Sequence, residues 1–152
     1  MVTRKIERVS VIAAIYATIT IVFAPLSYGL IQVRISEALT ILPFIFPESV
    51  LGLFLGCFIA NIYGGLGLID IVFGSLATLL AAFLTKKMPH PFLAPLPPVV
   101  INAVVVAFIL KYVLGYPFVV SMFYVGLGQF LACYFLGLPL LYLLQKYQWP
   151  KY

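Results

Sequence analysis

Long runs of apolar residues, interrupted by proline, glycine and a few charged residues, cover most of the chain. Dividing the chain at these interruptions gives six segments, listed here by residue number: 9–28, 35–46, 47–63, 67–85, 92–114 and 117–147. A helix needs roughly 20 residues to cross a hydrocarbon layer of about 30 Å. The pattern therefore predicts an all-α integral membrane protein, a six-transmembrane-helix bundle in which residues 1–152 form one domain.

The second segment, residues 35–46, is the shortest, and as an α-helix it would extend only about 18 Å. Charge decides whether it counts as a crossing. With six crossings the basic N-terminus, the Lys86–Lys87 loop and the C-terminal lysines share one side, and cytoplasmic loops carry an excess of Lys and Arg. We therefore predict six crossings with cytoplasmic N- and C-termini. The short second segment should be sheltered by its neighbours and not exposed to lipid.

Composition supports a membrane protein, because 64% of the residues are apolar and only 9% are charged, whereas soluble domains are nearer half apolar and a quarter charged. Six crossings leave no length for a soluble catalytic domain. The chain also lacks the phosphate-binding pattern GxxxxGK[ST], so any ATP has to be hydrolysed by partner chains. The net charge of +5 is interpreted as a topology signal and not as a nucleic-acid surface.

The first apolar run follows a basic stretch, as in a signal peptide, but no A-x-A pattern follows it, and we expect it to be retained as the first span.

Polar side chains within the segments are few and informative, because ionisable groups in a membrane span are costly and are functional hypotheses by default. Of the six candidates listed below, the first four fall in the predicted outer third of the membrane, and the last two lie near its predicted midplane. The candidate substrate-binding residues are Arg34, Glu37, Asn61, Asp70, Asn102 and Gln129.

Each candidate also has a structural interpretation. Asp70 could cap a helix N-terminus or pair with Arg34, and Glu37 also stands where a helix opens. Amide side chains in membranes commonly hold helices together, an alternative that applies to Asn61, Asn102 and Gln129.

Enzymatic and metal chemistry lack support in the sequence. No nucleophile stands beside a base, and no metal-ligand spacing occurs. His90 has no second ligand near it, and Cys57 and Cys133 lie in apolar runs, where cysteine is ordinary packing material. We therefore expect no enzyme activity, no metal and no cofactor.

Two segments carry small residues at helical spacing, which allows another helix to approach closely. In the third segment Gly52, Gly56, Ala60 and Gly64 recur every four residues, and packing within the bundle is the expected role. In the first segment the small residues are Ser10, Ala13, Ala14, Ala17 and Thr18. For these, internal packing and docking to a partner both stay open.

Several stretches together resemble a known family. They are QVRISEALTILP (Gln32–Pro43), GLFLGCFIANIYGGLGLIDIVFGSLATLLAA (Gly52–Ala82), the pair Pro97–Pro98 ahead of Asn102, and GLGQFLACYFLGLP (Gly126–Pro139). The chain is similar, from about Arg4 to Tyr147, to the queuosine-precursor transporter family, QueT. Members of this family are substrate-binding S components of energy-coupling-factor (ECF) transporters.

The resemblance implies a six-helix S component in a prokaryotic plasma membrane that captures a vitamin-like queuosine precursor outside the cell. It implies docking onto an ECF module, a transmembrane T component with two ABC ATPases, which alone use ATP. An A-x-x-x-A pattern on the first helix is the docking surface in this family type, and it matches Ala13 and Ala17. Gln129 departs from the family pattern, in which we expect an acid.

A 7-deazaguanine fits these side chains chemically. Its adjacent N–H donors suit a carboxylate, from Asp70 or Glu37, and its carbonyl suits an amide. Which carboxylate accepts from the ligand stays open. Two rival functions also stay open: a secondary transporter coupled to an ion gradient, and a structural subunit that binds no ligand. No internal inverted repeat supports the first rival.

Overall fold

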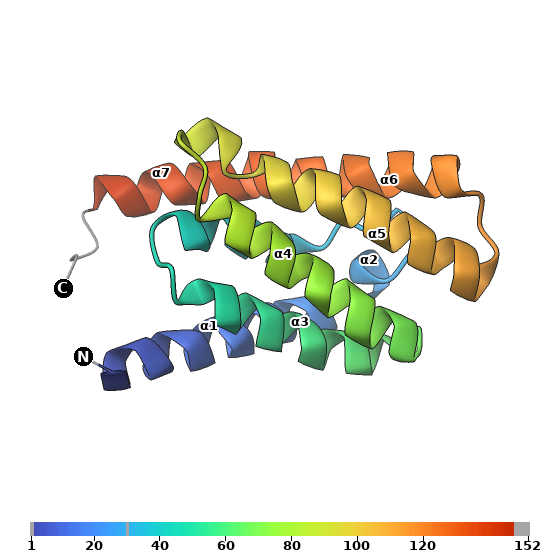
Figure 1. Cartoon of the computed structure of the whole chain (residues 1–152), viewed down its shortest axis with the longest axis horizontal. Helices are drawn as coiled ribbons and strands as arrows, with labels where there is room; N and C mark the ends of the chain where they lie inside the picture. Colours follow the sequence, from blue (N-terminus) through green and yellow to red (C-terminus); the bar gives the residue numbers. More distant parts are fainter. Residues whose placement is uncertain (1, 30, 148–152) are drawn as a thin grey trace.

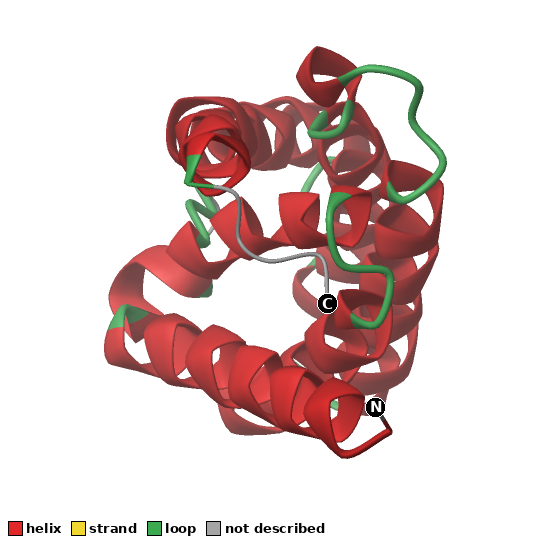
Figure 2. Ribbon diagram, turned by 90° about the vertical axis from the view of Figure 1, so that its left-hand side faces the viewer, coloured by secondary structure: helices red, strands yellow, loops and turns green. Residues whose placement is uncertain are grey.

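A computed structural model describes residues 2–29 and 31–147, which form helices joined by loops (Figure 2). No strand occurs within these two ranges, so the all-α prediction is confirmed. The helical elements are α1 (Val2–Val22), α2 (Ala24–Ser27), η1 (Ile35–Phe44), α3 (Ser49–Gly64), η2 (Asp70–Gly74), α4 (Ser75–Thr85), η3 (Pro91–Leu93), α5 (Leu96–Leu114), α6 (Phe118–Phe130), η4 (Leu131–Gly137) and α7 (Leu138–Lys146).

Two of the rods contain π-helical turns. The π-helix η2 continues directly into α4, and η4 joins α6 to α7 in one rod, Phe118–Lys146. This rod and the rod Pro91–Leu114 are long and apolar enough to cross a membrane. Three shorter apolar helices accompany them, at Ile35–Phe44, Ser49–Gly64 and Asp70–Thr85. Because π turns inside helices often occur at functional sites, the position of Asp70 as the first residue of η2 is of interest.

The helices pack in chain order around the short element η1. Contacts join α1 to α3, α3 to α4, α4 to α5 and α5 to α6, while η1 contacts α1, α3, α4, α7 and η4 (Figure 1). The element η1 is a 3-10 helix of 10 residues, which extend about 20 Å at about 2.0 Å per residue. Most of its side chains are buried. The second segment is therefore short and sheltered, as predicted.

Apolar side chains cover much of the outside of this bundle, and three charged side chains, Arg34, Glu37 and Asp70, are buried inside it. Large apolar residues such as Leu55, Phe108 and Phe123 are exposed, whereas Glu37 and Asp70 are buried. A water-soluble fold would reverse this arrangement, because ionised groups are rarely buried and broad apolar surfaces are avoided. The distribution is the one that a membrane protein needs.

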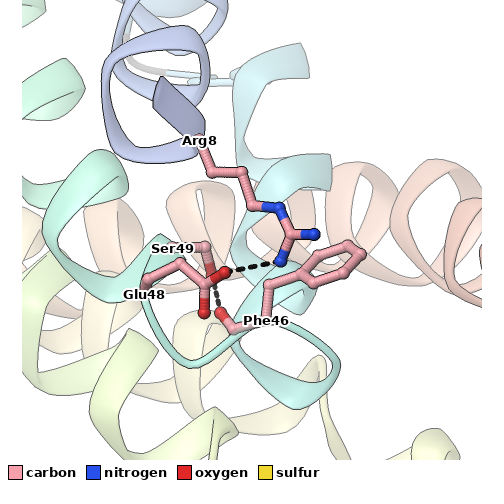
Figure 3. Close-up of polar contacts among 4 residues, drawn as sticks. All are labelled: Arg8, Phe46, Glu48 and Ser49. Carbon is pink, nitrogen blue, oxygen red and sulfur yellow. Dashed lines mark hydrogen bonds and ion pairs between the residues drawn. The ribbon is translucent and has the colours of Figure 1, made fainter. Parts of the chain in front are cut away.

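The start of α1, the end of α4 and the end of α7 lie at one end of the bundle (Figure 1). The basic residues that belong to these segments are Arg4, Lys5, Arg8, Lys86, Lys87 and Lys146. We call this end the basic end and the other the opposite end. Figure 3 shows an ion pair close to the start of α3, in which Arg8 Nη1 lies 2.7 Å from Glu48 Oε1. The Arg8 guanidinium also lies over the Phe46 ring, 4.9 Å from its centroid.

Small residues on α3 serve contacts within the chain, as expected. A Cβ atom added at Gly56 would lie 2.8 Å from Cβ of Tyr16, and one at Gly64 would lie 2.4 Å from the ring of Tyr28. Neither position has room for a larger residue. The stripe therefore lets α1 and the segment after it approach α3 closely.

The same contact involves Ala13, which together with Ala17 matches the docking pattern. Both side chains are buried, at 7% and 6% exposure, and the backbone of Ala13 lies against Gly56 of α3. Ala13 therefore takes part in packing α1 onto α3. The small residues of α1 that are exposed are Ser10, Ala14 and Thr18, on another face of the helix.

Candidate functional site

Four buried side chains from four elements form a continuous hydrogen-bonded group. The Tyr16 hydroxyl on α1 donates to Oε1 of Glu37 on η1. Nδ2 of Asn102 on α5 lies 3.2 Å from Oε2 of Glu37, and also 3.2 Å from Oε1 of Gln129 on α6. We call Tyr16, Glu37, Asn102 and Gln129 the central network. Both carboxylate oxygens of Glu37 are thereby satisfied within the protein.

The helical register explains why these side chains meet. Asn102 lies 12 residues before the end of α5 at Leu114, and Gln129 lies 11 residues after the start of α6 at Phe118. At about 1.5 Å per residue, both lie roughly 17 Å from the connection between the two antiparallel helices. The central network therefore lies near the middle of the continuous helices Pro91–Leu114 and Phe118–Lys146. Glu37 does not cap its own helix, which has no side-chain cap.

A second group surrounds the Cys57 thiol of α3. Its sulfur accepts from Thr78 Oγ1 at 3.3 Å, Asn61 Nδ2 at 3.5 Å and Arg34 Nη1 at 3.9 Å. We call Arg34, Cys57, Asn61 and Thr78 the Cys57 cluster. Cys57 packs in the same hydrophobic core as Tyr16, so the cluster adjoins the central network. The thiol is packing material, as expected, and also an acceptor at a junction of three elements.

Arg34 makes two further contacts with the segment that precedes it. Its Nε donates to the carbonyl oxygen of Ser27 at 3.2 Å, and its guanidinium lies over the Tyr28 ring, 5.3 Å from the centroid. Within residues 2–29 and 31–147, neither Glu37 nor Asp70 forms an ion pair with Arg34 within 4.0 Å. Arg34 is 5% exposed, so the charge is enclosed by the helices.

Asp70 lies beside this cluster, and one oxygen of its carboxylate has no hydrogen-bond partner in the described chain. Asn61 Nδ2 donates to the backbone carbonyl of Asp70 at 3.1 Å, while the buried Oδ2 of Asp70 has no hydrogen-bond partner in the described chain. No side chain caps the start of η2. The two structural interpretations of Asp70, an Arg34 ion pair and a helix cap, therefore do not match its geometry.

Several buried polar atoms, including Oδ2 of Asp70, lack hydrogen-bond partners among the described residues. Such atoms are rare enough in folded proteins to need an explanation. They are both amide atoms of Gln32, Oδ1 of Asn61, Oδ2 of Asp70, and the hydroxyls of Ser75 and Ser121. Gln32 was not among the residues that the sequence predicted. An amide within an otherwise apolar stretch, two residues before Arg34, is the signal that could have found it.

All six predicted substrate-binding residues are buried, with 5% exposure or less. The structure brings Glu37, Asn102 and Gln129 together directly. It brings Asn61 to the backbone of Asp70, and joins Asn61 to Arg34 through the Cys57 sulfur. Tyr16, a central member of the site, was missed because a tyrosine in an apolar helix carries no sequence signal of its role.

Metal-binding groups do not account for these contacts. No set of three His, Cys, Asp or Glu side chains with metal-binding geometry occurs within the described part of the chain. Nδ1 of His90 accepts a hydrogen bond from the backbone N–H of Phe92 at 3.2 Å, a local contact at the start of η3. The side chains of the site are joined by hydrogen bonds.

Comparisons with known proteins match most of the chain to one family. A family model described as "QueT transporter" matches residues 6–146. The queuosine precursor transporter QueT of Lactococcus lactis subsp. cremoris (strain MG1363) is 32% identical over 79 residues, which are 51% of this chain and 46% of that protein. The match thus spans about half the length of this relative. No solved structure matches the chain.

Proposed function

Because the chain belongs to the QueT transporter family, we propose that it is the substrate-binding S component of an ECF importer and captures a queuosine precursor of the 7-deazaguanine type. In this proposal the protein is a multi-pass protein of a prokaryotic plasma membrane with six crossings. It takes up its ligand outside the cell. The relative in Lactococcus lactis is named a queuosine precursor transporter, which supports the choice of ligand.

The observation that carries the proposal is the enclosure of six polar side chains within a bundle whose outside is apolar. Arg34, Glu37, Asn61, Asp70, Asn102 and Gln129 come from separate elements and are all buried. Burying such groups is costly unless they are paired, and some of their atoms have no partner in the described chain. A planar heterocycle with several donors and acceptors would supply the missing partners.

Charge supports an orientation in the membrane. The basic end carries Lys and Arg from the start of α1, the loop after α4 and the end of α7. In the proposed topology this end faces the cytoplasm, since cytoplasmic loops are enriched in these residues. Asn61 lies one turn before the end of α3, and Asp70 lies at the start of η2, so both are near the opposite end. The ligand would then enter from outside.

Transport in this proposal depends on partner chains. The sequence has no phosphate-binding loop, so a T component and two ABC ATPases would supply ATP hydrolysis. The chain itself would need no cofactor, and its role would be selection of the ligand.

Equilibrium binding to the purified full chain tests the proposal. The panel contains 7-deazaguanine and its 7-substituted forms, guanine, and several B vitamins. We expect saturable binding of the deazaguanines and none of the vitamins, together with co-purification of a T component and ATPases from the native membrane. Absence of deazaguanine binding would overturn the ligand assignment. Uptake driven by an ion gradient in vesicles that hold this chain alone would favour the secondary-transporter alternative.

A further inference from the structure

Within the proposed site, and resting on the proposed function, we infer that Asp70, Asn61 and Gln32 contact the ligand, whereas Glu37 is a positioning residue. Sequence reasoning leaves the two carboxylates equivalent, and it does not identify Gln32. The hydrogen bonds of the structure separate these residues into a satisfied set and an unsatisfied set. The unpaired atoms of the unsatisfied set indicate which donors and acceptors the ligand would have to supply.

Glu37 belongs to the satisfied set. Its Oε1 accepts from the Tyr16 hydroxyl and its Oε2 accepts from Asn102. A ligand that used either oxygen would have to compete with one of these donors in an interior where each bond is costly to lose. The role of Glu37 is to fix Asn102, which in turn holds Gln129.

Asp70 and Asn61 belong to the unsatisfied set. Oδ2 of Asp70 and Oδ1 of Asn61 are buried acceptors with no donor in the described chain, and the hydrogen bond from Asn61 Nδ2 to the Asp70 carbonyl keeps the two residues adjacent. Both side chains also reach Gly74. A Cβ atom at Gly74 would lie 2.7 Å from Asn61 Nδ2 and 2.9 Å from Asp70 Oδ1. Two neighbouring acceptors need two neighbouring donors.

Gln32 adds a donor and an acceptor of its own. Its side chain is 1% exposed, and neither Nε2 nor Oε1 has a partner in the described chain. Its backbone lies against α6, because a Cβ atom at Gly128 would be only 2.2 Å from the Gln32 carbonyl oxygen. Gly128 is the residue before Gln129 of the central network on the same helix. Its amide N–H groups suit a ring carbonyl on the ligand.

Together these atoms describe a ligand with an amino group beside a ring N–H, and a carbonyl next to that N–H. This is the 2-amino-4-oxopyrimidine edge of a guanine-type base. A site whose buried polar groups must be paired rejects analogues that lack one of these groups, because the protein atom is then left unsatisfied. The exocyclic 2-amino group, facing Asp70, is therefore the part of the ligand on which specificity should depend most.

Binding of 7-deazaguanine and of 7-deazahypoxanthine, which lacks the 2-amino group, tests this inference on the purified full chain. The wild type should bind 7-deazaguanine at least about 100-fold more tightly. Asp70→Asn should weaken 7-deazaguanine binding by more than about tenfold and largely remove the preference over 7-deazahypoxanthine, and Gln32→Ala should weaken the binding of both ligands. Glu37→Gln should keep the preference. Glu48→Gln, a matched acid-to-amide change at the basic end, should leave affinity and preference unchanged.

Two further variants keep the inference testable if Asp70→Asn does not fold. Gly74→Ala keeps the carboxyl group of Asp70, but the added Cβ would force the side chains of Asp70 and Asn61 to move, so it should also reduce the preference. Gly126→Ala is its control, because the added Cβ would meet only Cβ of Ala103, at 3.4 Å. If the wild type binds no deazaguanine, the proposed function fails. If it binds and Glu37→Gln alone loses the preference, while Asp70→Asn or Gly74→Ala keeps it, the function stands and the inference is overturned.

Discussion

Nδ2 of Asn102 donates to Oε2 of Glu37 at 3.2 Å, although 65 residues separate them in the chain. The same nitrogen also lies 3.2 Å from Oε1 of Gln129, so one amide joins α5, η1 and α6. The element η1 is a short 3-10 helix, and its own backbone hydrogen bonds do not join it to the other helices. Side-chain bonds of this type therefore fix its height and rotation among the longer helices.

Replacing Asn102 by leucine should destabilise the fold, because Oε2 of Glu37 and Oε1 of Gln129 would both lose a donor in the interior. We expect the free energy of unfolding to fall by about 1–3 kcal/mol. Thermal unfolding of the detergent-solubilised protein measures this loss as a lower Tm. Val104→Ala, at an exposed position of the same helix, is the control. Equal Tm values for Asn102→Leu and this control would contradict a stabilising role for the amide.

The sequence was sufficient to predict the helical segments, the short sheltered second segment and the burial of the polar side chains. These features follow from hydropathy and from the cost of placing polar groups in lipid, both of which are local properties of the chain. The pattern predicts an α-helix of about 18 Å over residues 35–46, whereas the structure has a 3-10 helix at Ile35–Phe44. Its shelter among the other helices supports this less common form.

The pairing of side chains could not be predicted, because periodicity gives the face of a helix and not the neighbour that it meets. Asn102 and Gln129 could both be placed near the midplane by counting residues, but Glu37, the other partner of Asn102, comes from an element of different geometry. Tyr16 was missed for a similar reason, since only the three-dimensional contact reveals that its hydroxyl meets Glu37. The small residues on α1 are compatible with both internal packing and docking, and only the structure shows that Ala13 packs against Gly56 of α3.

Gly128 should tolerate no side chain. A Cβ atom there would lie 2.2 Å from the carbonyl oxygen of Gln32, which is backbone and cannot rotate away. Gly128→Ala should therefore reduce the free energy of unfolding by about 1–3 kcal/mol through overpacking, and this loss should appear as a lower Tm. Gly126→Ala, two residues earlier on α6, is the matched control and should match or exceed the wild-type Tm, since alanine favours a helix over glycine by up to about 1 kcal/mol. Equal stability of the two variants would mean that the Gln32 segment does not press against α6.

Two alanines on α1 should separate folding from docking. Ala17 is buried, so Ala17→Leu should lower the Tm by overpacking the interior beside α1. Ala14 is exposed, so Ala14→Leu should leave the Tm near that of the wild type. If the proposed ECF module docks on the exposed face of α1, Ala14→Leu should reduce its co-purification with the chain. Full co-purification with Ala14→Leu would place the module on another surface.

The ion pair between Arg8 and Glu48 predicts a pH dependence of stability. Burial would raise the pKa of the Glu48 carboxyl, but hydrogen bonds from the backbone and from Arg8 outweigh this and hold the pKa below its usual value of 4.5. Because the pKa is lowered on folding, the pair stabilises the protein above about pH 4.5, and this contribution is lost as the pH falls through the lower value of the folded state. Both side chains are partly exposed, so the contribution should be at most about 1 kcal/mol.

Thermal unfolding of wild type and Glu48→Gln between pH 3 and pH 8 measures this contribution. The variant should have the lower Tm at pH 7, since the glutamine amide has no charge to pair with Arg8. The difference should shrink as the pH falls below 4.5, because the wild-type carboxyl then takes up a proton and loses its charge. Glu7→Gln, an exposed acid beside Arg8 on α1, should match the wild type at every pH. A Tm difference between wild type and Glu48→Gln that persists unchanged at pH 3 would show that shape and packing at this position, and not charge, couple the start of α1 to the segment before α3.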